Sequence, residues 1–453
     1  MALYEMKDTI AAQATAPGEG GVAIVRLSGA RCREILARVF RPASGKPLKA
    51  RYLTLGHVLD GEDVVDEAMA VLMPAPHSYT REDVAEIQCH GSDALVRKIL
   101  YLLLRAGARM AGPGEFTYRA FMNGRIDLAQ AEAVMRMIRA GSDRAMRSAI
   151  RQMEGGVSAF VRQAREEITA LLAEIAAAID FPDEVEESAA AGEVRARCEA
   201  IAARLRASCD ARAGRIEDEG LRVVLCGRPN AGKSSLMNAL LMEERAIVTD
   251  VPGTTRDTLT EAVQMDGIRV SLTDTAGLRE TGDAVERIGV ERARKALTGA
   301  DVRLLVMDGS RPFTGEDRQT LMGLEPHAVV LTKGDLTAAV DETEVERAFP
   351  GARRVVVCAL TGEGMDALRQ MIVSFAPQED GESSALSQAR HAQAALRACG
   401  ALEDAVRAID GGMPLDVCAV DLSAALDCLG EITGETLNEE VIGQVFARFC
   451  VGK

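Results

Sequence analysis

The sequence predicts a protein of the α/β-plus-α class. It comprises an N-terminal α/β domain and a discontinuous helical domain, into which a P-loop α/β domain with a mostly parallel sheet is inserted. Apolar, strand-like runs alternate with charged amphipathic stretches over residues 220–377, which is typical of a parallel sheet wound with helices. Sequence rich in Ala, Leu, Glu and Arg, with apolar spacings of three and four, flanks that segment on both sides. Two unrelated helical domains remain the alternative.

Composition narrows the class of protein further. A chain of 453 residues is long enough for about three domains, and 47% hydrophobic residues exclude a disordered chain. No run approaches the roughly 18 apolar residues of a membrane span, and Lys7, Asp8 and Glu19 argue against a signal peptide. Ten cysteines without a C-x-x-C pair predict reduced thiols and a cytoplasmic location. The net charge of −15 argues against indiscriminate binding to nucleic acid or membrane but leaves room for a local basic groove.

The segment before the nucleotide-binding domain divides into two parts. Residues 1–123 are expected to form the N-terminal α/β domain, with strands at 21–27 and 65–73 and a helix at 92–106. Residues 124–219 are expected to form the first half of the helical domain, with a break at residues 180–183 where Pro182 ends one helix. Residues 378–453, after a polar linker, would supply the second half.

The nucleotide-binding domain is organised around residues 227–234, which read Gly-Arg-Pro-Asn-Ala-Gly-Lys-Ser. This fits the phosphate-binding pattern G-x-x-x-x-G-K-[ST]. An apolar β-branched run at 221–226 precedes it and a helix-compatible run at 235–241 follows, so the turn would aim a helix N-terminus at an anion. We expect Lys233 to reach the β- and γ-phosphates and Ser234 to ligate Mg²⁺.

Four further elements follow in the order that GTP binding requires. Thr255, in Gly-Thr-Thr-Arg at 253–256, would reach Mg²⁺ and the γ-phosphate. Asp274, after the predicted strand 268–272, would hold Mg²⁺, and Gly277 would sense the γ-phosphate. Asp335, in Thr-Lys-Gly-Asp, can accept both N–H groups of a guanine edge, and residues 358–360 can offer a backbone N–H to guanine O6. Five ordered elements predict GTP as the nucleotide.

Two positions depart from the usual guanine motifs. Thr332 stands where Asn is usual, which puts one supporting hydrogen bond in doubt, and Cys358 stands where Ser is usual. Asp335 should still select guanine, because an unpaired carboxylate against adenine would cost roughly 1–3 kcal/mol or more.

The residue that normally orients the attacking water is missing. Signalling GTPases place Gln directly after Asp-x-x-Gly, and this chain has Leu278 there. The amide oxygen of Asn230, inside the phosphate loop, is placed to ligate a monovalent cation beside the phosphates. Glu286 is the nearest downstream carboxylate that could orient water, although its spacing alone favours a solvated helix residue.

Several motifs resemble those of the MnmE/TrmE family of tRNA-modifying GTPases. The resemblance covers the whole chain and is carried by residues 15–26, 112–116, 127–132, 227–236, 249–257, 274–279, 286–289 and 449–453. It implies a GTPase that, with a flavin-dependent partner of the GidA/MnmG type, adds a carboxymethylaminomethyl or aminomethyl group at C5 of the wobble uridine of certain tRNAs. It implies a homodimer that joins this partner in a heterotetramer or larger assembly. The one-carbon donor would be 5-formyl- or 5,10-methylene-tetrahydrofolate.

The resemblance also assigns roles to residues. It makes Asn230 a K⁺ ligand with Thr249, Val251 and Thr254 in the same site, Ser234 and Thr255 Mg²⁺ ligands, and Glu286 the residue that orients water. The residues expected to bind nucleotide or its ions are Asn230, Ala231, Gly232, Lys233, Ser234, Ser235, Thr249, Asp250, Val251, Pro252, Gly253, Thr254, Thr255, Asp274, Thr275, Ala276, Gly277, Thr332, Lys333, Gly334, Asp335, Cys358, Ala359 and Leu360.

By the same resemblance the N-terminal domain binds folate and mediates dimerisation. Arg26, Glu86, Arg125 and Lys453 are the implied folate contacts, since Arg and Lys suit carboxylates and Glu suits the donor edge of a pterin. Arg125 stands where the family often has Lys, which keeps the charge but changes its geometry.

Three points stay open on sequence alone. Cys450 is by resemblance the family's terminal cysteine, which could be a nucleophile or redox group, or a small buried residue beside Phe446 and Phe449. Five arginines fall within an arc of about 140° on a helical wheel: Arg136, Arg139, Arg144, Arg147 and Arg151. Such a stripe could contact phosphates, but it is more often a solvated face. The alternative function is that of a ribosome-assembly GTPase of the Era kind, which also carries Leu after Asp-x-x-Gly.

Overall fold

The computed structural model describes residues 4, 6–180, 187–244, 260–274, 296–315, 317, 324–377 and 386–452. Its contacts divide the chain into two compact units. The first contains Met1–Met135, Arg151–Ala203 and Ala394–Lys453, and the second contains Arg136–Ile150 and Arg204–Gln393. Both units are therefore assembled from separate stretches of the sequence.

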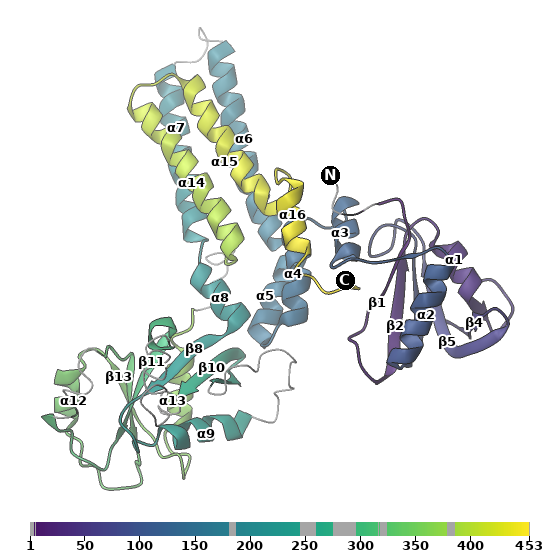
Figure 1. Ribbon diagram of the computed structural model, residues 1–453. Helices are drawn as coiled ribbons and strands as arrows, with labels where there is room; N and C mark the ends of the chain where they lie inside the picture. Colours follow the sequence, from purple (N-terminus) through teal and green to yellow (C-terminus); the bar gives the residue numbers. More distant parts are fainter. Residues whose placement is uncertain are drawn as a thin grey trace, which may run out of the picture. The chain divides into compact units, whose positions relative to one another are not determined.

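The first unit begins with a seven-stranded sheet of order β3-β4-β5-β6-β2-β1-β7. All neighbours are antiparallel except β1 and β7, which are parallel. The strands are β1 (Ile10–Gln13), β2 (Gly20–Ser28), β3 (Phe40–Pro42), β4 (Thr54–Asp60), β5 (Asp63–Met73), β6 (Val84–Gly91) and β7 (Arg109–Met110). Helices α1 (Cys32–Val39) and α2 (Asp93–Arg105) lie beside this sheet (Figure 1). Their buried side chains share an apolar core with it.

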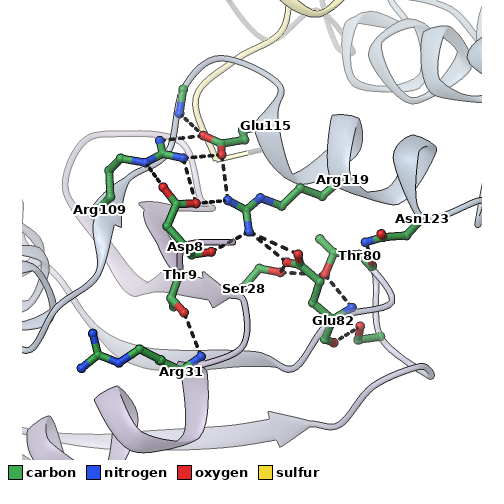
Figure 2. Close-up of polar contacts among 12 residues, drawn as sticks. Asp8, Thr9, Ser28, Arg31, Thr80, Glu82, Arg109, Glu115, Arg119 and Asn123 are labelled. Atoms are coloured by element: carbon green, nitrogen blue, oxygen red, sulfur yellow. Dashed lines mark hydrogen bonds and ion pairs between the residues drawn. The ribbon is translucent and has the colours of Figure 1, made fainter. Parts of the chain in front are cut away.

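A buried ionic cluster joins residues near the start of this domain's sequence to residues near its end (Figure 2). Arg119, on α3 (Glu115–Met122), is fully buried and donates to Asp8 Oδ1 at 2.7 Å, Glu115 Oε1 at 3.0 Å and Glu82 Oε2 at 3.2 Å. Arg109 at β7 donates to Asp8 Oδ2 at 2.6 Å and Glu115 Oε1 at 2.7 Å. Glu115 Oε2 also accepts from the backbone N–H of Gly112 at 2.8 Å. The motif at residues 112–116 therefore places a carboxylate between two arginines.

The two arginines of the cluster favour the ionised form of Asp8. Burial acts to raise the pKa of Asp8, but hydrogen bonds from Arg109 and Arg119 outweigh it and lower that pKa. Glu82 is held in turn by Ser28 Oγ, which donates to its Oε2 at 2.6 Å. A buried charge is tolerated only when it is paired and hydrogen-bonded, and each carboxylate here meets that condition.

The same unit contains a helical bundle built from both sides of the inserted segment (Figure 1). Cys399 Sγ donates to Ala202 O at 3.4 Å, and Arg195 pairs with Asp410 at 2.9 Å. These contacts join α7 (Glu187–Ala207) to α14 (Ala389–Asp410). The alternative of two unrelated helical domains is therefore wrong. The helices of the bundle are α6 (Gly156–Asp180), α7 (Glu187–Ala207), α14 (Ala389–Asp410) and α15 (Leu415–Thr433).

Two short helices share a buried apolar cluster with Tyr118 of α3, and the C-terminal segment returns to residues 113–114 of the N-terminal domain. These helices are α4 (Leu128–Arg139) and α16 (Glu439–Phe446). Val451 forms a β-bridge with Pro113, and Gly114 donates its N–H to Cys450 O at 3.2 Å. Gly114 has φ of +65°, and a Cβ there would lie 2.7 Å from Phe449 Cβ, so only glycine allows this close approach.

The second unit contains a six-stranded sheet of order β13-β12-β11-β8-β10-β9, in which only β9 is antiparallel to its neighbour. Its strands are β8 (Leu221–Cys226), β9 (Thr260–Met265), β10 (Ile268–Asp274), β11 (Val302–Asp308), β12 (Ala328–Thr332) and β13 (Arg353–Val356). The helices described in this unit are α5 (Asp143–Met153), α8 (Ala211–Glu219), α9 (Lys233–Glu244), α12 (Glu342–Ala348) and α13 (Met365–Val373). The mostly parallel sheet confirms the predicted fold class.

Helix α6 is described as far as Asp180, the first residue of the predicted break at 180–183, and residues 181–186 lie outside the described residues. Within the part of the chain that the structure describes, no helix is long and apolar enough to cross a membrane.

Candidate functional site

The phosphate loop connects β8 to α9 at the carboxyl edge of the parallel sheet. Gly227 has φ of +143°, and a Cβ at this position would lie 2.2 Å from the carbonyl oxygen of Val306 on β11. Gly232 has φ of +91° and lies against Thr332. The two glycines of the pattern thus let the loop pass tightly over the ends of neighbouring strands.

Lys233 lies at the first position of α9 and is only 4% exposed. Its Nζ donates to Gly227 O at 3.0 Å and to Arg228 O at 2.7 Å, so the loop's own carbonyls hold the ammonium group. A buried cation enclosed by a loop is suited to bind the oxygens of a polyphosphate.

Ser234 and Asp274 come together from different elements. Ser234 Oγ donates to Asp274 Oδ2 at 3.0 Å, and the carboxylate stands at the end of β10, which pairs in parallel with β8. Hydroxyl and carboxylate oxygens are the ligands that Mg²⁺ prefers, so this pair fits the ion. Among the described residues no group of three His, Cys, Asp or Glu side chains could hold a metal. The phosphates would therefore supply further ligands, as is usual for Mg²⁺.

Thr332 makes a hydrogen bond of its own between the guanine motif and the phosphate loop. Its side chain is buried at the end of β12, and Oγ1 lies 2.7 Å from Ala231 O and 3.1 Å from Met307 O. A hydroxyl has one proton, so it donates to one of these carbonyls at a time. The shorter contact ties the phosphate loop to the guanine motif.

Replacing Thr332 with Val should weaken GTP binding about five- to tenfold, because the isosteric side chain cannot donate to Ala231 O and leaves that carbonyl unpaired, at a cost of about 1–1.5 kcal/mol. Thr332→Ser keeps the hydroxyl and should bind within about twofold of the parent. Titration of a fluorescent GTP analogue measures both. Equal affinity of the Val variant and the parent would contradict the role of the hydroxyl.

Asp335 and Cys358 also lie close together. Cys358 is buried, and its Sγ donates to Asp335 Oδ1 at 3.2 Å, the contact that a serine hydroxyl would make. The backbone N–H of Cys358 donates to Glu363 O at 2.9 Å. The N–H groups available to guanine O6 in the predicted segment are therefore those of Ala359 and Leu360.

Sequence reasoning missed the role of Asp308. Its Oδ2 accepts from Lys333 Nζ at 2.5 Å, and Lys333 itself has φ of +61°. Burial acts to raise the pKa of Asp308, but hydrogen bonds from Lys333 and Ser310 outweigh it and hold that pKa below its ordinary value. The pair joins the ends of β11 and β12 beneath the guanine motif. The position of Asp308 at the end of a parallel strand was the signal that could have revealed it.

The remaining predicted nucleotide residues divide into two groups. Asn230 is exposed in the loop with φ of +61°, Ser235 is exposed on α9, and Gly334 donates its N–H to Val357 O. The predictions that lie outside the described residues are Thr249, Asp250, Val251, Pro252, Gly253, Thr254, Thr255, Thr275, Ala276, Gly277, Leu278 and Glu286.

Three of the four predicted folate residues gather in the N-terminal domain, around Tyr79. Arg26 Nε donates to Glu86 Oε1 at 2.8 Å across the pair of strands β2 and β6. The guanidinium of Arg26 lies 5.8 Å from the centre of the Tyr79 ring, and that of Arg125 lies 4.8 Å from it. Arg125 also donates to Tyr79 O at 2.7 Å. Lys453, the fourth, lies outside the described residues.

Cys450 is exposed, whereas Phe446 and Phe449 beside it are buried. The interpretation of Cys450 as a small buried residue is therefore wrong. It is the exposed member of a set of ten free cysteines whose other members are buried or half-buried. An accessible thiol is a requirement for redox or nucleophilic chemistry.

The predicted stripe of arginines does not form one helical face. Helix α4 ends at Arg139 and α5 begins at Asp143, so the phase of the helical wheel is lost between them. Arg136 pairs with Glu217 at 3.0 Å, and Arg144 is buried within 3.9 Å of the same carboxylate. At least these two arginines stabilise the second unit and do not belong to an open phosphate-binding surface.

Comparisons with known proteins cover nearly the whole chain. Residues 128–450 match the family described as the MnmE helical domain, and residues 9–125 match the GTP-binding protein TrmE N-terminus. The tRNA modification GTPase MnmE of Symbiobacterium thermophilum is 47% identical over 99% of this chain and 100% of its own. The protein of the same name from Geobacillus kaustophilus is 46% identical over 98% and 99%. That from Chloroflexus aurantiacus is 46% identical over 99% and 100%.

Proposed function

Because this chain belongs to the MnmE family of tRNA modification GTPases, we propose that it hydrolyses GTP to drive modification of the wobble uridine of certain tRNAs. The observation that carries the proposal is the phosphate loop, in which Lys233 is enclosed by loop carbonyls and Ser234 meets Asp274. The chain is similar over its full length to a tRNA modification GTPase, and this similarity does not favour the Era-like alternative.

We infer that Lys233 binds the phosphates, that Ser234 and Asp274 hold Mg²⁺, and that Asp335 selects guanine. The bound Mg²⁺ would neutralise charge on the phosphates. Asn230 is proposed as a K⁺ ligand, together with Thr249, Val251 and Thr254. Its support is the exposed position of Asn230 in the loop and the absence of Gln at position 278. Glu286 is proposed to orient the attacking water.

Hydrolysis should be at least about tenfold faster in K⁺ than in Na⁺ and should rise in specific rate with protein concentration, because a cation at a dimer interface replaces an arginine finger worth roughly 10³–10⁵ in rate. Asn230→Ala should lose the K⁺ response while still binding GDP. Phosphate release measured in both salts over a dilution series tests this. Equal turnover in Na⁺ and K⁺ at every dilution would show the cation site to be wrong.

In the N-terminal domain we propose a folate one-carbon site made by Arg26, Glu86, Arg125 and Lys453. It is supported by the cluster around Tyr79, which offers cations for carboxylates and an acceptor for a pterin edge. Exposed Cys450 is proposed to take part in the chemistry. The homodimer, the flavin-dependent partner and a cytoplasmic location belong to the same proposal, as do domain limits at residues 123, 219 and 377.

Mass spectrometry of tRNA from a deletion strain tests the tRNA activity directly. Unmodified wobble uridine that is restored by the wild-type gene is the expected result. Normal wobble uridine with a defect in ribosomal subunit assembly would instead support the Era-like alternative. Complementation with a Cys450→Ser variant then shows whether the thiol is required.

A further inference from the structure

Residues 35–59 of the N-terminal domain contain no Asp or Glu, although the chain as a whole has a net charge of −15. This stretch includes β3 and the loop that joins β3 to β4, and β3 is the edge strand of the seven-stranded sheet. We call residues 41–53 the basic loop. Its cations are all exposed: Arg41, Lys46, Lys49 and Arg51. A local positive patch on an acidic chain is therefore open to a partner at the edge of the sheet.

The four cations of the basic loop keep their charge available. Among the residues that the structure describes, none of the four forms an ion pair with a carboxylate. Other exposed arginines of the same domain do, as Arg33 does with Asp83 at 2.7 Å. Clustered cations that no carboxylate neutralises attract a polyanion, and RNA phosphates gain affinity by releasing their counterions to such a patch.

An exposed aromatic ring lies among these charges. Tyr52 is 58% exposed, and Lys49 Nζ lies 4.1 Å from the centre of its ring. The ammonium group covers one face of the ring and leaves the other face for a second planar group. Proteins bind single-stranded RNA with this combination, in which cations contact the phosphates and bases stack on aromatic side chains.

The backbone of the basic loop is held in a fixed turn. The N–H of Tyr52 donates to Lys49 O at 3.1 Å, and the N–H of Arg51 donates to Leu72 O on β5 at 2.8 Å. Arg51 has φ of +65°, a conformation that favours glycine and strains any residue with a side chain. Strain of this kind is concentrated at functional sites. The turn therefore presents Lys49 and Tyr52 in one fixed arrangement.

The basic loop is hydrogen-bonded to the segment that carries the proposed folate cluster. Arg51 Nη2 donates to His77 O at 2.8 Å. His77 precedes Tyr79 by two residues, and the guanidinium groups of Arg26 and Arg125 lie against the Tyr79 ring. An RNA bound to the basic loop would thus be anchored close to the residues that we assign to the one-carbon donor.

We propose that the basic loop binds the substrate tRNA, with its four cations contacting phosphates and Tyr52 stacking on an unpaired base. The inference rests on the proposed function of this chain as a tRNA-modifying GTPase, and it names the surface that meets the tRNA. It also locates that surface on the N-terminal domain, whereas the sequence had suggested the arginines of α4 and α5.

Binding of fluorescein-labelled tRNA to the full chain tests this inference. The probe is bulk tRNA from the deletion strain, and anisotropy is measured with GDP and Mg²⁺ at saturation over a series of salt concentrations. Lys46→Gln combined with Lys49→Gln should weaken binding about tenfold at about 0.1 M NaCl and reduce the slope of log affinity against log salt by roughly 1–2. Tyr52→Leu should weaken binding about tenfold and leave that slope unchanged, because stacking releases no counterion.

The matched control combines Arg195→Gln with Arg197→Gln on α7. It removes the same charge from two arginines that pair with Asp410 and Glu174, and it should bind tRNA within about twofold of the parent. Equal thermal unfolding midpoints will show that the exposed substitutions preserve the fold.

The outcomes separate this inference from the proposed function. Parent-like affinity in both loop variants, or an equal loss in the control, would overturn the inference while the parent still binds tRNA, so the proposed function would stand. Loss of binding to phosphatidylglycerol vesicles without loss of tRNA binding would also overturn it and assign the loop to a membrane. If the parent binds no tRNA, the inference is wrong, and the wobble uridine of the deletion strain decides the proposed function independently.

Discussion

Replacing Gly227 with Ala will weaken GTP binding about 100-fold or more, equivalent to roughly 3 kcal/mol, and hydrolysis will fall with it. The added Cβ would lie 2.2 Å from Val306 O, a backbone atom at the centre of the sheet. The left-handed φ of +143° adds strain of roughly 1–3 kcal/mol for any residue with a side chain. The loop would have to move away from the strand ends, and Lys233 would lose the carbonyl of residue 227 as a partner.

Equilibrium binding of GDP and GTP, with the phosphate release rate at saturating GTP, measures this effect. Gly299→Ala in the same unit is the control, because a Cβ there meets nothing within 4 Å and its φ is not left-handed. That control should bind nucleotide as the parent does. Nucleotide affinity within about threefold of the parent for Gly227→Ala would mean that the loop relaxes without cost, and the steric argument would fail.

Arg119→Met should destabilise the N-terminal domain by about 3–5 kcal/mol, because removing one partner of a buried ion cluster leaves uncompensated charge. Among the described residues, Asp8 and Glu115 would keep Arg109 as their cationic partner, and Glu82 would keep the hydrogen bond from Ser28 Oγ. Hydrogen exchange of amides in β1, β2 and α3 should therefore accelerate, whereas amides of β8 and β11 should exchange as in the parent.

The matched control for this prediction is Arg33→Met. Arg33 pairs with Asp83 at 2.7 Å in the same domain, but its side chain is 56% exposed, so the change should cost far less stability than the loss of Arg119. If amides of the N-terminal domain exchange at the same rate in both variants, the buried ion pairs of Arg119 stabilise the domain no more than a surface pair does. The claim that breaking the cluster in Figure 2 is costly would then be wrong.

The nucleotide-binding domain could be predicted from sequence because its signals are local. Strand β8, the phosphate loop and α9 follow one another directly, so pattern and spacing locate all three. The hydrogen bond from Thr332 could not be predicted, since its acceptor Ala231 lies 101 residues away on another element. Residue types at single positions do not reveal which side chains meet across a sheet.

The ionic cluster and the arginine stripe show two other limits. Asp8, Arg109 and Arg119 carry no periodic pattern, and only the fold brings them together. The stripe was extended across the junction of α4 and α5, where a helical wheel no longer applies. Burial of Arg144 against Glu217 depends on α8, a helix whose packing the sequence does not specify.

The bridge between Val451 and Pro113 has a consequence for the order in which the protein folds during synthesis. All of the nucleotide-binding domain is translated between these two residues, so the ribosome completes that domain before the N-terminal domain can receive its last strand-like contact. Closing so long a loop is slow when it must wait for non-local partners. The surface of Gly112, Pro113 and Gly114 will therefore stay open on the nascent chain until translation has passed residue 452, and it is there that a chaperone would have longest access.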